Sequence, residues 1–454
     1  MKRHLAAVVA AAALSAIGAD RDWSSLLRKG LNAARELQRQ QAPSQPVPVA
    51  RPPAPTAEVQ SPEMQAAADQ RPEVRLEATA SEPIGTELLP LRRLPLITGA
   101  MGVNLLVEVD GTVKSWGDPG GEATYLGDGT TRGIEEPAEI PGLRGVVDAA
   151  VAPGHALVLL RDGTVMTWGR NRGCELTVKD DKKRLTPFVV KGVRNAVQVA
   201  AAFEFSATVL RDGTVLAWGN NESGMLANGR SGSSENCAFE PVMVEGLTGV
   251  KKLVVDNNAV AVLKRDGTVW GWGANKEGQL CDGTTQLRTR PVQMVGISGA
   301  VDIDADDGTV IVLDNGTVWR CGPNALAQST KRPDSVGMKK SQPVPVAGIA
   351  GAVAARASGY GTTFVRLRDG TLRGWGSGIF GALGNGSVEG DSSKPSAPIG
   401  LGPVLDQFWA SNSAYAIRAD GTVMAWGFYT GGRANAKNEW QLTPVAWRKV
   451  QLAD

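Results

Sequence analysis

One short pattern recurs seven times along the chain and constrains its fold more than any other feature. Each copy reads Asp-Gly or Asn-Gly, then Thr, then Val or Leu, and it follows a run of apolar residues. Such a pair between two apolar runs predicts a tight β-hairpin, because Gly adopts the positive φ that the turn requires without steric cost. The pairs are separated by 49 to 54 residues and begin at Asp110, Asp162, Asp212, Asp266, Asn315, Asp369 and Asp420. The chain is therefore a repeat array.

Each copy also carries a Trp and enough apolar segments for four short strands. Six residues after the Asp or Asn comes Trp116, Trp168, Trp218, Trp272, Trp375 or Trp426, and in the fifth copy this position is Cys321. A further strand precedes each hairpin, as in the run of mostly small residues from Ala196 to Ala201, and a Pro-Val segment follows a polar loop in most copies. Seven four-stranded units without a helical period predict an all-β, seven-bladed β-propeller.

The same pattern predicts where each strand lies within a blade. A strand that contains Pro fits the outer edge, where the missing N–H is harmless. A strand of small residues fits the axis, where seven sheets converge. We expect the repeated Trp to pack between neighbouring blades, where burying the indole removes about 150–250 Å² from water.

The N-terminus differs from the repeats and has the features of an export signal. A basic start is followed by the apolar run Leu5 to Ile17 and by small residues, which is typical of a signal peptide over 1–19. Residues 20–41 predict a short amphipathic helix, which either docks on a partner or borders a disordered arm. Residues 42–94 are rich in Pro, Ala and Gln and predict a linker, so the propeller covers 95–454. We expect an exported protein, periplasmic or extracellular, with no membrane span.

The repeat resembles that of the regulator of chromosome condensation family. The resemblance is clearest in the fourth copy, Asp-Gly-Thr-Val-Trp-Gly-Trp-Gly from Asp266 to Gly273, with Gly278-Gln279-Leu280 after it. It implies a seven-bladed propeller. The family includes nucleotide-exchange factors and signalling modules, and a secreted bacterial inhibitor of β-lactamases has a related propeller. Only His155 keeps the His that family repeats usually carry, and no exchange-factor residues match by motif, so guanine-nucleotide exchange is not expected.

The composition argues against several kinds of chemistry. Lys and Arg total 48 against 46 Asp and Glu, which does not favour a nucleic-acid-binding surface. There are two His residues, and removal of the signal peptide would leave His155 alone, which disfavours zinc sites and a Ser-His-Asp triad. The Gly-rich stretches fit turns of the repeat rather than a phosphate-binding loop, and we expect no cofactor.

One acidic group keeps a weak metal hypothesis open. Asp302, Asp304 and Asp306 alternate and would share one face of an extended strand. Three carboxylates on one face could contribute to a Ca²⁺ site, or they could hydrate the mouth of the central channel. The spacing of the usual Ca²⁺-binding loop is absent.

The turns between the first and second strands of each copy differ from one another, whereas the hairpins are uniform. In a propeller these turns gather on one face, where rigid loops form a natural binding surface. We expect a partner to contact this face, with Tyr360 as the anchor because aromatic groups dominate interface energetics. The predicted contact residues are Asn257, Asn258, Asp306, Asp307, Tyr360 and Asn412.

Four cysteines allow three disulfide pairings in an exported protein. Cys237 and Cys281 lie in loops of neighbouring copies and are the predicted pair, and Cys321, at a Trp position, is predicted to be a buried thiol.

The function that these features favour is an exported, monomeric, non-catalytic protein that binds another protein of unknown identity. Two alternatives remain. One is a secreted inhibitor of the β-lactamase-inhibitor propeller type, and the other is a propeller enzyme, a lyase or hydrolase, with an acidic site at the channel mouth.

Overall fold

The computed structural model describes residues 88–100, 102–117, 125–232, 237–256, 258–305, 308–322, 341–358, 361–378, 381–387, 391–410, 413–427 and 441–453. The chain divides into two compact units, Met1–Ser81 and Glu82–Asp454, and all described residues belong to the second. The predicted signal peptide, the predicted helix and most of the predicted linker lie outside the described residues. Within the ranges described, no helix is long and apolar enough to cross a membrane.

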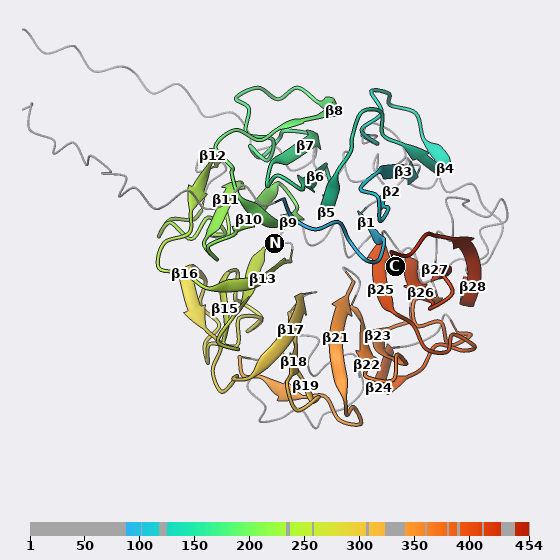
Figure 1. Ribbon diagram of the computed structural model, residues 1–454. Coiled ribbons are helices and arrows are strands. Elements are labelled where there is room, and N and C mark those ends of the chain that lie inside the picture. The colour runs from blue at the N-terminus through green and yellow to red at the C-terminus, as the bar shows by residue number, and fades with distance from the viewer. Residues whose placement is uncertain are drawn as a thin grey trace, which may run out of the picture. The chain divides into compact units, whose positions relative to one another are not determined.

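The described residues form 28 β-strands around a common centre (Figure 1). They make five four-stranded antiparallel sheets and one eight-stranded sheet, in which β1–β4 and β25–β28 are joined by one parallel bridge. We call each set of four consecutive strands a blade. Blades 1 to 3 consist of β1 (Leu96–Ala100), β2 (Val103–Val107), β3 (Val113–Gly117) and β4 (Ile134–Glu139); β5 (Val146–Ala152), β6 (His155–Leu160), β7 (Val165–Gly169) and β8 (Arg184–Val189); β9 (Ala196–Ala202), β10 (Phe205–Leu210), β11 (Val215–Gly219) and β12 (Ala238–Met243). Blades 4 and 5 consist of β13 (Val250–Val255), β14 (Ala259–Lys264), β15 (Val269–Gly273) and β16 (Arg288–Gln293); β17 (Ala300–Ala305), β18 (Thr309–Leu313), β19 (Val318–Arg320) and β20 (Val344–Pro345). Blades 6 and 7 consist of β21 (Ala352–Ala357), β22 (Thr362–Leu367), β23 (Leu372–Ser377) and β24 (Asp391–Ser396); β25 (Asp406–Ala410), β26 (Ser413–Ile417), β27 (Thr422–Gly427) and β28 (Gln441–Lys449). The predicted all-β propeller is confirmed.

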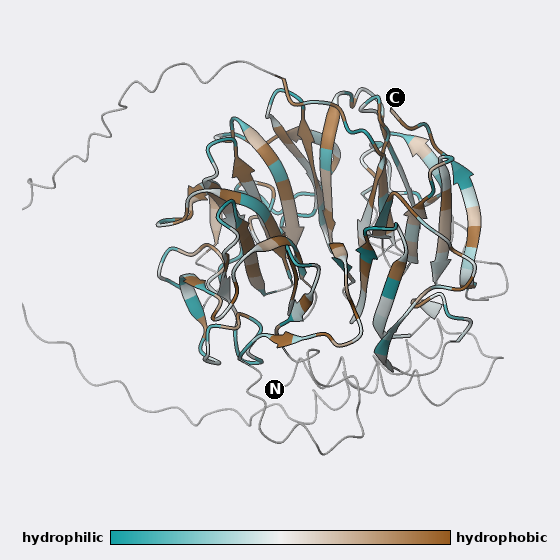
Figure 2. Ribbon diagram, turned by 60° about the horizontal axis from the view of Figure 1, so that its bottom comes forward, coloured by the Kyte–Doolittle hydropathy of each residue, from teal (hydrophilic) through white to brown (hydrophobic). Residues whose placement is uncertain are grey.

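In each blade the first strand lies nearest the centre and the fourth lies at the rim (Figure 1). Small residues are abundant in some inner strands, as in β9, which reads AVQVAAA. They are not general at the axis, since β13 reads VKKLVV and β25 reads DQFWA. The rim strands mix hydrophobic and hydrophilic residues (Figure 2) and all contain Pro: Pro137, Pro187, Pro241, Pro291, Pro345, Pro395 and Pro444. Pro removes a backbone donor from each exposed edge, and this hinders edge-to-edge pairing with another chain.

The Asp-Gly hairpins have two structural tasks. The Asp or Asn side chain accepts a hydrogen bond from the backbone N–H of the Thr two residues later, at 2.8–3.0 Å in all seven copies. The following Gly has φ between 77° and 83°. In blade 2, the Gly163 N–H donates to the Leu160 carbonyl, so Arg161 and Asp162 form the turn and Gly163 follows it as a bulge.

The same Gly contacts the next blade. The Gly163 carbonyl accepts from the N–H of Ala196, where the inner strand of blade 3 begins, and equivalent bonds of 2.8–3.2 Å join the first six hairpins to the blades that follow them. A Cβ on Gly163 would lie 2.9 Å from the Asn195 Cα. The hairpin Gly is therefore required for packing between blades as well as for its positive φ.

The repeated Trp lies between neighbouring blades. Trp116, Trp168, Trp218, Trp272 and Trp426 are fully buried, and Trp375 is 5% exposed. Four indole N–H groups donate at 2.7–3.0 Å to a backbone carbonyl of the preceding blade: Trp168 to Tyr125, Trp218 to Glu175, Trp272 to Met225 and Trp426 to Ala382. The apolar core is accordingly divided among the junctions; Trp168, for example, packs with Val103 and Leu105 of blade 1.

The predicted disulfide pairing is wrong. Cys174 pairs with Cys237, and Cys281 pairs with Cys321, so no described cysteine is free and Cys321 is not a thiol. The Cα atoms lie 6.0 and 5.6 Å apart, within the usual span of a disulfide. Cys237 and Cys281 do lie in neighbouring blades, as expected, but each bonds to the neighbour on its other side. One disulfide therefore joins blades 2 and 3, and the other joins blades 4 and 5.

The two ends of the propeller meet without exchanging a strand. A single parallel bridge joins Gly99 of β1 to Ala410 of β25. Trp447 of β28 packs against Trp116 of blade 1, with ring centroids 5.3 Å apart, and the Ala453 N–H donates to the Arg93 carbonyl. The last part of the predicted linker, residues 88–94, also contacts the propeller, since the Leu89 N–H donates to the Arg161 carbonyl at 2.7 Å.

Candidate functional site

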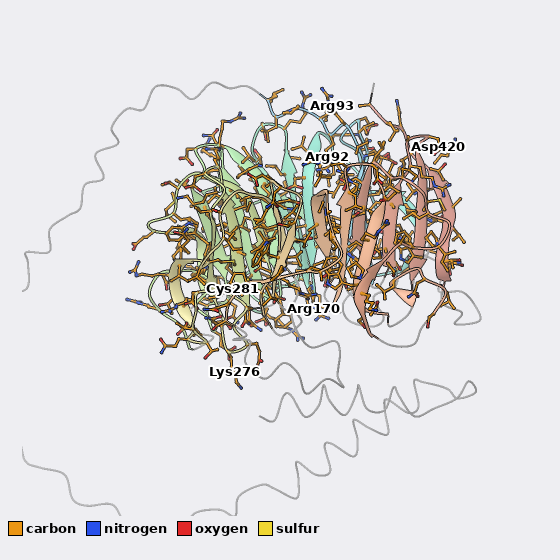
Figure 3. The ribbon with its side chains drawn as sticks, turned by 90° about the horizontal axis from the view of Figure 1, so that it is seen from below. Arg92, Arg93, Arg170, Lys276, Cys281 and Asp420 are labelled. Atoms are coloured by element: carbon orange, nitrogen blue, oxygen red, sulfur yellow. A yellow bond between two sulfur atoms is a disulfide. The ribbon has the colours of Figure 1, made fainter. Side chains whose placement is uncertain are left out.

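The propeller has two faces that differ in how their residues are used. We call the face with the Asp-Gly hairpins the hairpin face. The loop face is the opposite one, with the turns between first and second strands and the start of the long loops between third and fourth strands. Figure 3 shows Arg92, Arg93 and Asp420 on the hairpin side, and Arg170, Lys276 and Cys281 on the loop side.

Most of the predicted binding residues are not described. Asn257, Asp306, Asp307, Tyr360 and Asn412 lie outside the described residues, so their role stays a prediction. Asn258 is described and exposed on the loop face, where its Oδ1 accepts a hydrogen bond from the Ser223 hydroxyl at 3.2 Å. Ser223 belongs to the long loop of blade 3 and Asn258 to the first turn of blade 4, so this bond crosses a blade junction.

The structure adds an aromatic residue that sequence reasoning missed. Phe203 forms the turn between β9 and β10 with Glu204, and 52% of its surface is exposed. Glu204 has φ of 56°, whereas the equivalent positions of blades 1, 2 and 6 hold Gly102, Gly154 and Gly361 at positive φ. A non-Gly residue in this conformation costs about 1–2 kcal/mol, and the same holds for the five other non-Gly residues with positive φ: Cys174, Thr177, Asn195, Ala227 and Cys281. An apolar residue at the end of an apolar strand gave no signal in the sequence.

Three contacts hold the Phe203 turn in place. The Glu204 carbonyl accepts from the Asn220 N–H at 2.8 Å, and the Glu204 carboxylate accepts from the Asn220 side-chain amide at 3.0 Å. On the other side the backbone of Gly173 lies against Glu204, because a Cβ on Gly173 would be 2.5 Å from the Glu204 Cβ. Phe203 is therefore exposed on a turn whose backbone is fixed by two blades.

The loop that contains Gly173 is also fixed. The buried Glu175 carboxylate accepts from the backbone N–H groups of Arg172 and Gly173 at 3.1 and 2.6 Å, and burial raises the pKa of this carboxyl. Buried Asn171 accepts from the Leu176 N–H at 3.0 Å and donates to the Val178 carbonyl at 2.7 Å. The Arg172 side chain is exposed at the start of this loop.

Asn at this loop position recurs and was another missed signal. Asn221 and Asn275, three residues after Trp218 and Trp272, are buried and accept from the N–H of Leu226 and Leu280 at 2.9 and 3.0 Å. Each also donates to a backbone carbonyl later in its loop. The shared Trp-Gly-x-Asn spacing could have indicated this role in three copies.

The acidic residues proposed as a weak metal site lie in the channel wall, among positive charges. Asp302 contacts Lys252 at 2.6 Å and Arg356 at 3.5 Å, and accepts from the Ala355 N–H at 3.0 Å. Burial alone would raise the pKa of the Asp302 carboxyl, but these two cations hold it below its usual value. Burial raises the pKa of Asp304, whose carboxylate accepts from the Ala357 N–H at 3.0 Å. Asp306 is not described, and among the described residues no three His, Cys, Asp or Glu side chains are placed to hold a metal ion.

Asp302 belongs to a series of contacts between inner strands. Asp148 accepts from the Val199 N–H at 3.1 Å and Gln198 accepts from the Leu253 N–H at 2.8 Å, as Asp302 does from Ala355. In each case the side chain bonds the backbone of the next blade. The sequence did not reveal this series because the residue type changes from blade to blade.

His155 is fully buried at the junction of blades 2 and 3. Its Nε2 lies 2.8 Å from the hydroxyl of Ser206, which is also fully buried. Burial lowers the pKa of His155 to about 3, so the ring is neutral at ordinary pH. No substrate can reach a Ser–His pair without exposed surface, and the pair instead links two blades.

The sequence comparisons agree with this geometry. The family model for the Regulator of chromosome condensation (RCC1) repeat matches residues 266–312, which run from the hairpin of blade 4 into β18. The E3 ubiquitin-protein ligase HERC2 of Homo sapiens is 30% identical over 235 residues, which are 49% of this chain. The match covers only 5% of the length of HERC2.

Solved structures show the same fold at low sequence identity. Human WBSCR16 superimposes with a TM-score of 0.60 at 20% identity, over 71% of this chain and 87% of that one. Prp20p from Saccharomyces cerevisiae gives a TM-score of 0.61 at 18% identity, over 79% of this chain and 88% of that one. In its repeated hairpins, Trp residues and four-stranded units, the chain resembles the RCC1 repeat family.

Proposed function

We propose that this chain is an exported, non-catalytic propeller that binds another protein through its loop face. The RCC1-like propeller fold supports the general function, since Prp20p, a structural neighbour, is described together with its binding to Gsp1p and histones. Those partners are properties of Prp20p. At 18% identity, the similarity between Prp20p and this chain shows a shared fold. The ligase activity in the name of HERC2 belongs to HERC2, and this chain matches only 5% of that protein's length.

The observation that carries the proposal is the unequal use of the two faces. On the hairpin face, the Asp or Asn, Gly and Thr of the hairpins take part in bonds that shape the turn or join it to the next blade. Their uniformity is thus explained by folding. On the loop face, Phe203 is 52% exposed, on a turn whose next residue, Glu204, has positive φ. Exposed, rigid aromatic groups are typical of protein-binding surfaces.

Two observations support export. The N-terminal sequence has the order of a signal peptide, and the four cysteines form two disulfides between blades. Disulfides persist in oxidising compartments and are rare in the cytosol. The proposal therefore places the protein in the periplasm or outside the cell.

The acidic-site enzyme is the weaker alternative. Asp302 and Asp304 each accept a backbone N–H of the next blade, and Asp302 also pairs with Lys252 and Arg356. These bonds give both carboxylates a role in joining blades.

The inhibitor alternative is tested by adding excess purified protein to a β-lactamase assay; undiminished hydrolysis would argue against it.

Two measurements test the proposed function. Fractionation of cells that express the full chain should recover a processed protein with both disulfides in the exported fraction; an unprocessed cytosolic protein with free thiols would contradict export. Affinity capture from the cell envelope should then recover one stoichiometric partner, which is lost when Phe203 is replaced by Ser and kept when Arg265 of the hairpin face is replaced by Ser. Recovery that depends on Arg265 alone would contradict the choice of face.

A further inference from the structure

We infer that Arg172 and Phe203 form a binding site for an acidic protein segment that carries an apolar side chain. We call these two residues the Arg172–Phe203 patch. The inference rests on the proposed function and goes beyond it, because it names the place on the loop face and the chemistry of the partner. It concerns residues of blades 2 and 3 that the sequence did not single out.

The two residues lie on either side of one contact between blades. Gly173 packs against Glu204, Arg172 immediately precedes Gly173, and Phe203 immediately precedes Glu204. Both side chains are exposed. A partner segment that lies along this junction would therefore meet a guanidinium from one blade and an aromatic ring from the next.

The patch is rigid before any partner binds. The Glu175 carboxylate holds the backbone of Arg172, and Asn220 holds the backbone and side chain of Glu204. Cys174, next to Gly173, is bonded to Cys237 of blade 3. A fixed backbone reduces the conformational entropy that is lost on binding, which is how preorganised sites gain affinity.

The charge of the blade 2 loop defines the partner. The blade 2 loop and the first residue of β8, from Arg170 to Arg184, hold six basic residues and three acidic ones, a formal charge of +3 (6 − 3) on a chain whose total is +2. One acidic residue, Glu175, is buried, and another, Asp180, pairs with Arg184 at 2.9 Å. The exposed side chains include Arg172, Lys179 and Lys182. Carboxylates on the partner would complement this loop, and an apolar side chain would cover Phe203.

A protein segment fits this surface better than a nucleic acid does. Nucleic-acid sites use an uninterrupted basic surface that follows a phosphate backbone. Here exposed Asp180 and Asp181 lie within the basic loop, and exposed Glu222 lies in the neighbouring loop of blade 3. The interrupting acidic residues suit a partner with spaced carboxylates better than they suit a continuous polyanion.

The test uses random peptides, because the natural partner is not identified. The full-length protein with its disulfides formed is used to select twelve-residue peptides from a display library, and the affinity of selected peptides is measured by fluorescence anisotropy. We expect the selected sequences to carry Asp or Glu beside Leu, Ile, Val or Phe. We expect Phe203→Ser to weaken binding at least tenfold and Arg172→Glu at least fivefold.

Matched controls separate this site from a general surface effect. Val189→Ser removes an apolar residue of similar exposure, 50%, from the rim strand β8, and Arg194→Glu reverses an exposed charge in the connection between β8 and β9. Both should leave affinity within twofold. A selected peptide with its acidic residues changed to Lys should bind Arg172→Glu better than it binds the wild type.

Each contrary result overturns the inference. The inference is wrong if the selection yields no acidic peptide, or if the patch and control substitutions change peptide affinity equally. It is also wrong if a labelled single-stranded oligonucleotide binds with the same affinity as the peptides. If peptides bind and the patch variants are silent, the patch is wrong and the proposed protein-binding function stands. If envelope capture also yields no partner, the proposed function fails with it. Unchanged circular dichroism of Phe203→Ser and Arg172→Glu shows that both remain folded.

Discussion

Cys281 and Cys321 form a disulfide at the one described junction where the repeated Trp is replaced. Cys321 occupies the Trp position of its strand, since its N–H donates to the Thr309 carbonyl, and Cys281 lies two residues beyond Gln279. Gln279 corresponds to Tyr125, Glu175, Met225 and Ala382, whose carbonyls accept the indole N–H at the other junctions. A covalent bond between blades 4 and 5 thus takes the place of a packed indole and its hydrogen bond.

This substitution predicts that the disulfide and the Trp are interchangeable. Replacing both cysteines by Ala should lower the free energy of unfolding by about 2–5 kcal/mol, the usual cost of losing a native disulfide. Cys281→Ala combined with Cys321→Trp should recover at least half of that loss. Guanidinium unfolding without reductant measures both. Equal stability of the two double variants would show that the junction has no room for an indole.

Trp218 should be among the most costly side chains to remove. It is fully buried, packs between blades 2 and 3, and donates to the Glu175 carbonyl at 2.9 Å. Trp218→Ala should lower the free energy of unfolding by about 3–5 kcal/mol. A loss below about 1 kcal/mol in urea unfolding would mean that the indole does not hold the blades together.

His155 should make the protein less stable in mild acid. Burial lowers its folded pKa to about 3, against 6.5 for an ordinary His. Below pH 6.5, His155 is therefore protonated in the unfolded chain, whereas in the folded chain it stays neutral until about pH 3. The stability that neutral His155 provides is present above pH 6.5 and is lost as the pH falls, by up to about 1.4 kcal/mol per pH unit.

The variant His155→Gln isolates this effect from other titrating groups. Buried Asp148, Asp304 and Glu175 have raised pKa values and act in the opposite direction, because their protonation in acid relieves a cost of burial. Between pH 6.5 and 4, the free energy of unfolding of the wild type should fall more steeply than that of His155→Gln. Parallel curves for the two proteins would contradict a buried neutral His155.

Asp302 should be essential to the channel wall. Asp302→Ala would leave Lys252 and Arg356 without this shared carboxylate, and removing one partner of a buried ion pair costs about 3–5 kcal/mol. We expect the lower end, because both cationic side chains remain about a quarter exposed, at 25% and 28%. Asp314→Ala, an exposed change on the hairpin face, is the control and should cost less than about 0.5 kcal/mol. Equal losses of unfolding free energy in the two variants would argue that the ion pairs of Asp302 with Lys252 and Arg356 do not stabilise the channel wall.

The sequence was sufficient for features that each repeat must satisfy. Hairpins, rim strands with Pro and the Trp at the junctions follow from local rules that act alike in seven copies, so repetition made them visible. The hairpin pattern nevertheless reflects more than turn geometry, because Gly163 also meets the backbone of the next blade at Asn195. Contacts of this kind depend on the closed ring and cannot be read from one repeat.

Features specific to one junction could not be predicted. The partner of Cys237 depends on which neighbouring loop lies within bonding distance. The sequence was compatible with a disulfide to the blade before it or to the blade after it. Phe203 resembled the end of an apolar strand until the structure placed it in a turn. The acidic alternation at Asp302 and Asp304 was visible, but the cations beside Asp302 come from blades 4 and 6, about 50 residues away in sequence.

The central claim is that the loop face binds a protein, and site-specific photocrosslinking tests it most directly. A photoreactive phenylalanine analogue is placed at Phe203 on the loop face or at Arg265 on the hairpin face, and cells of the source organism that express each full-length variant are irradiated. The account predicts one discrete covalent adduct with another protein from position 203 and none from position 265. Adducts from position 265 alone, or from neither position, would contradict it.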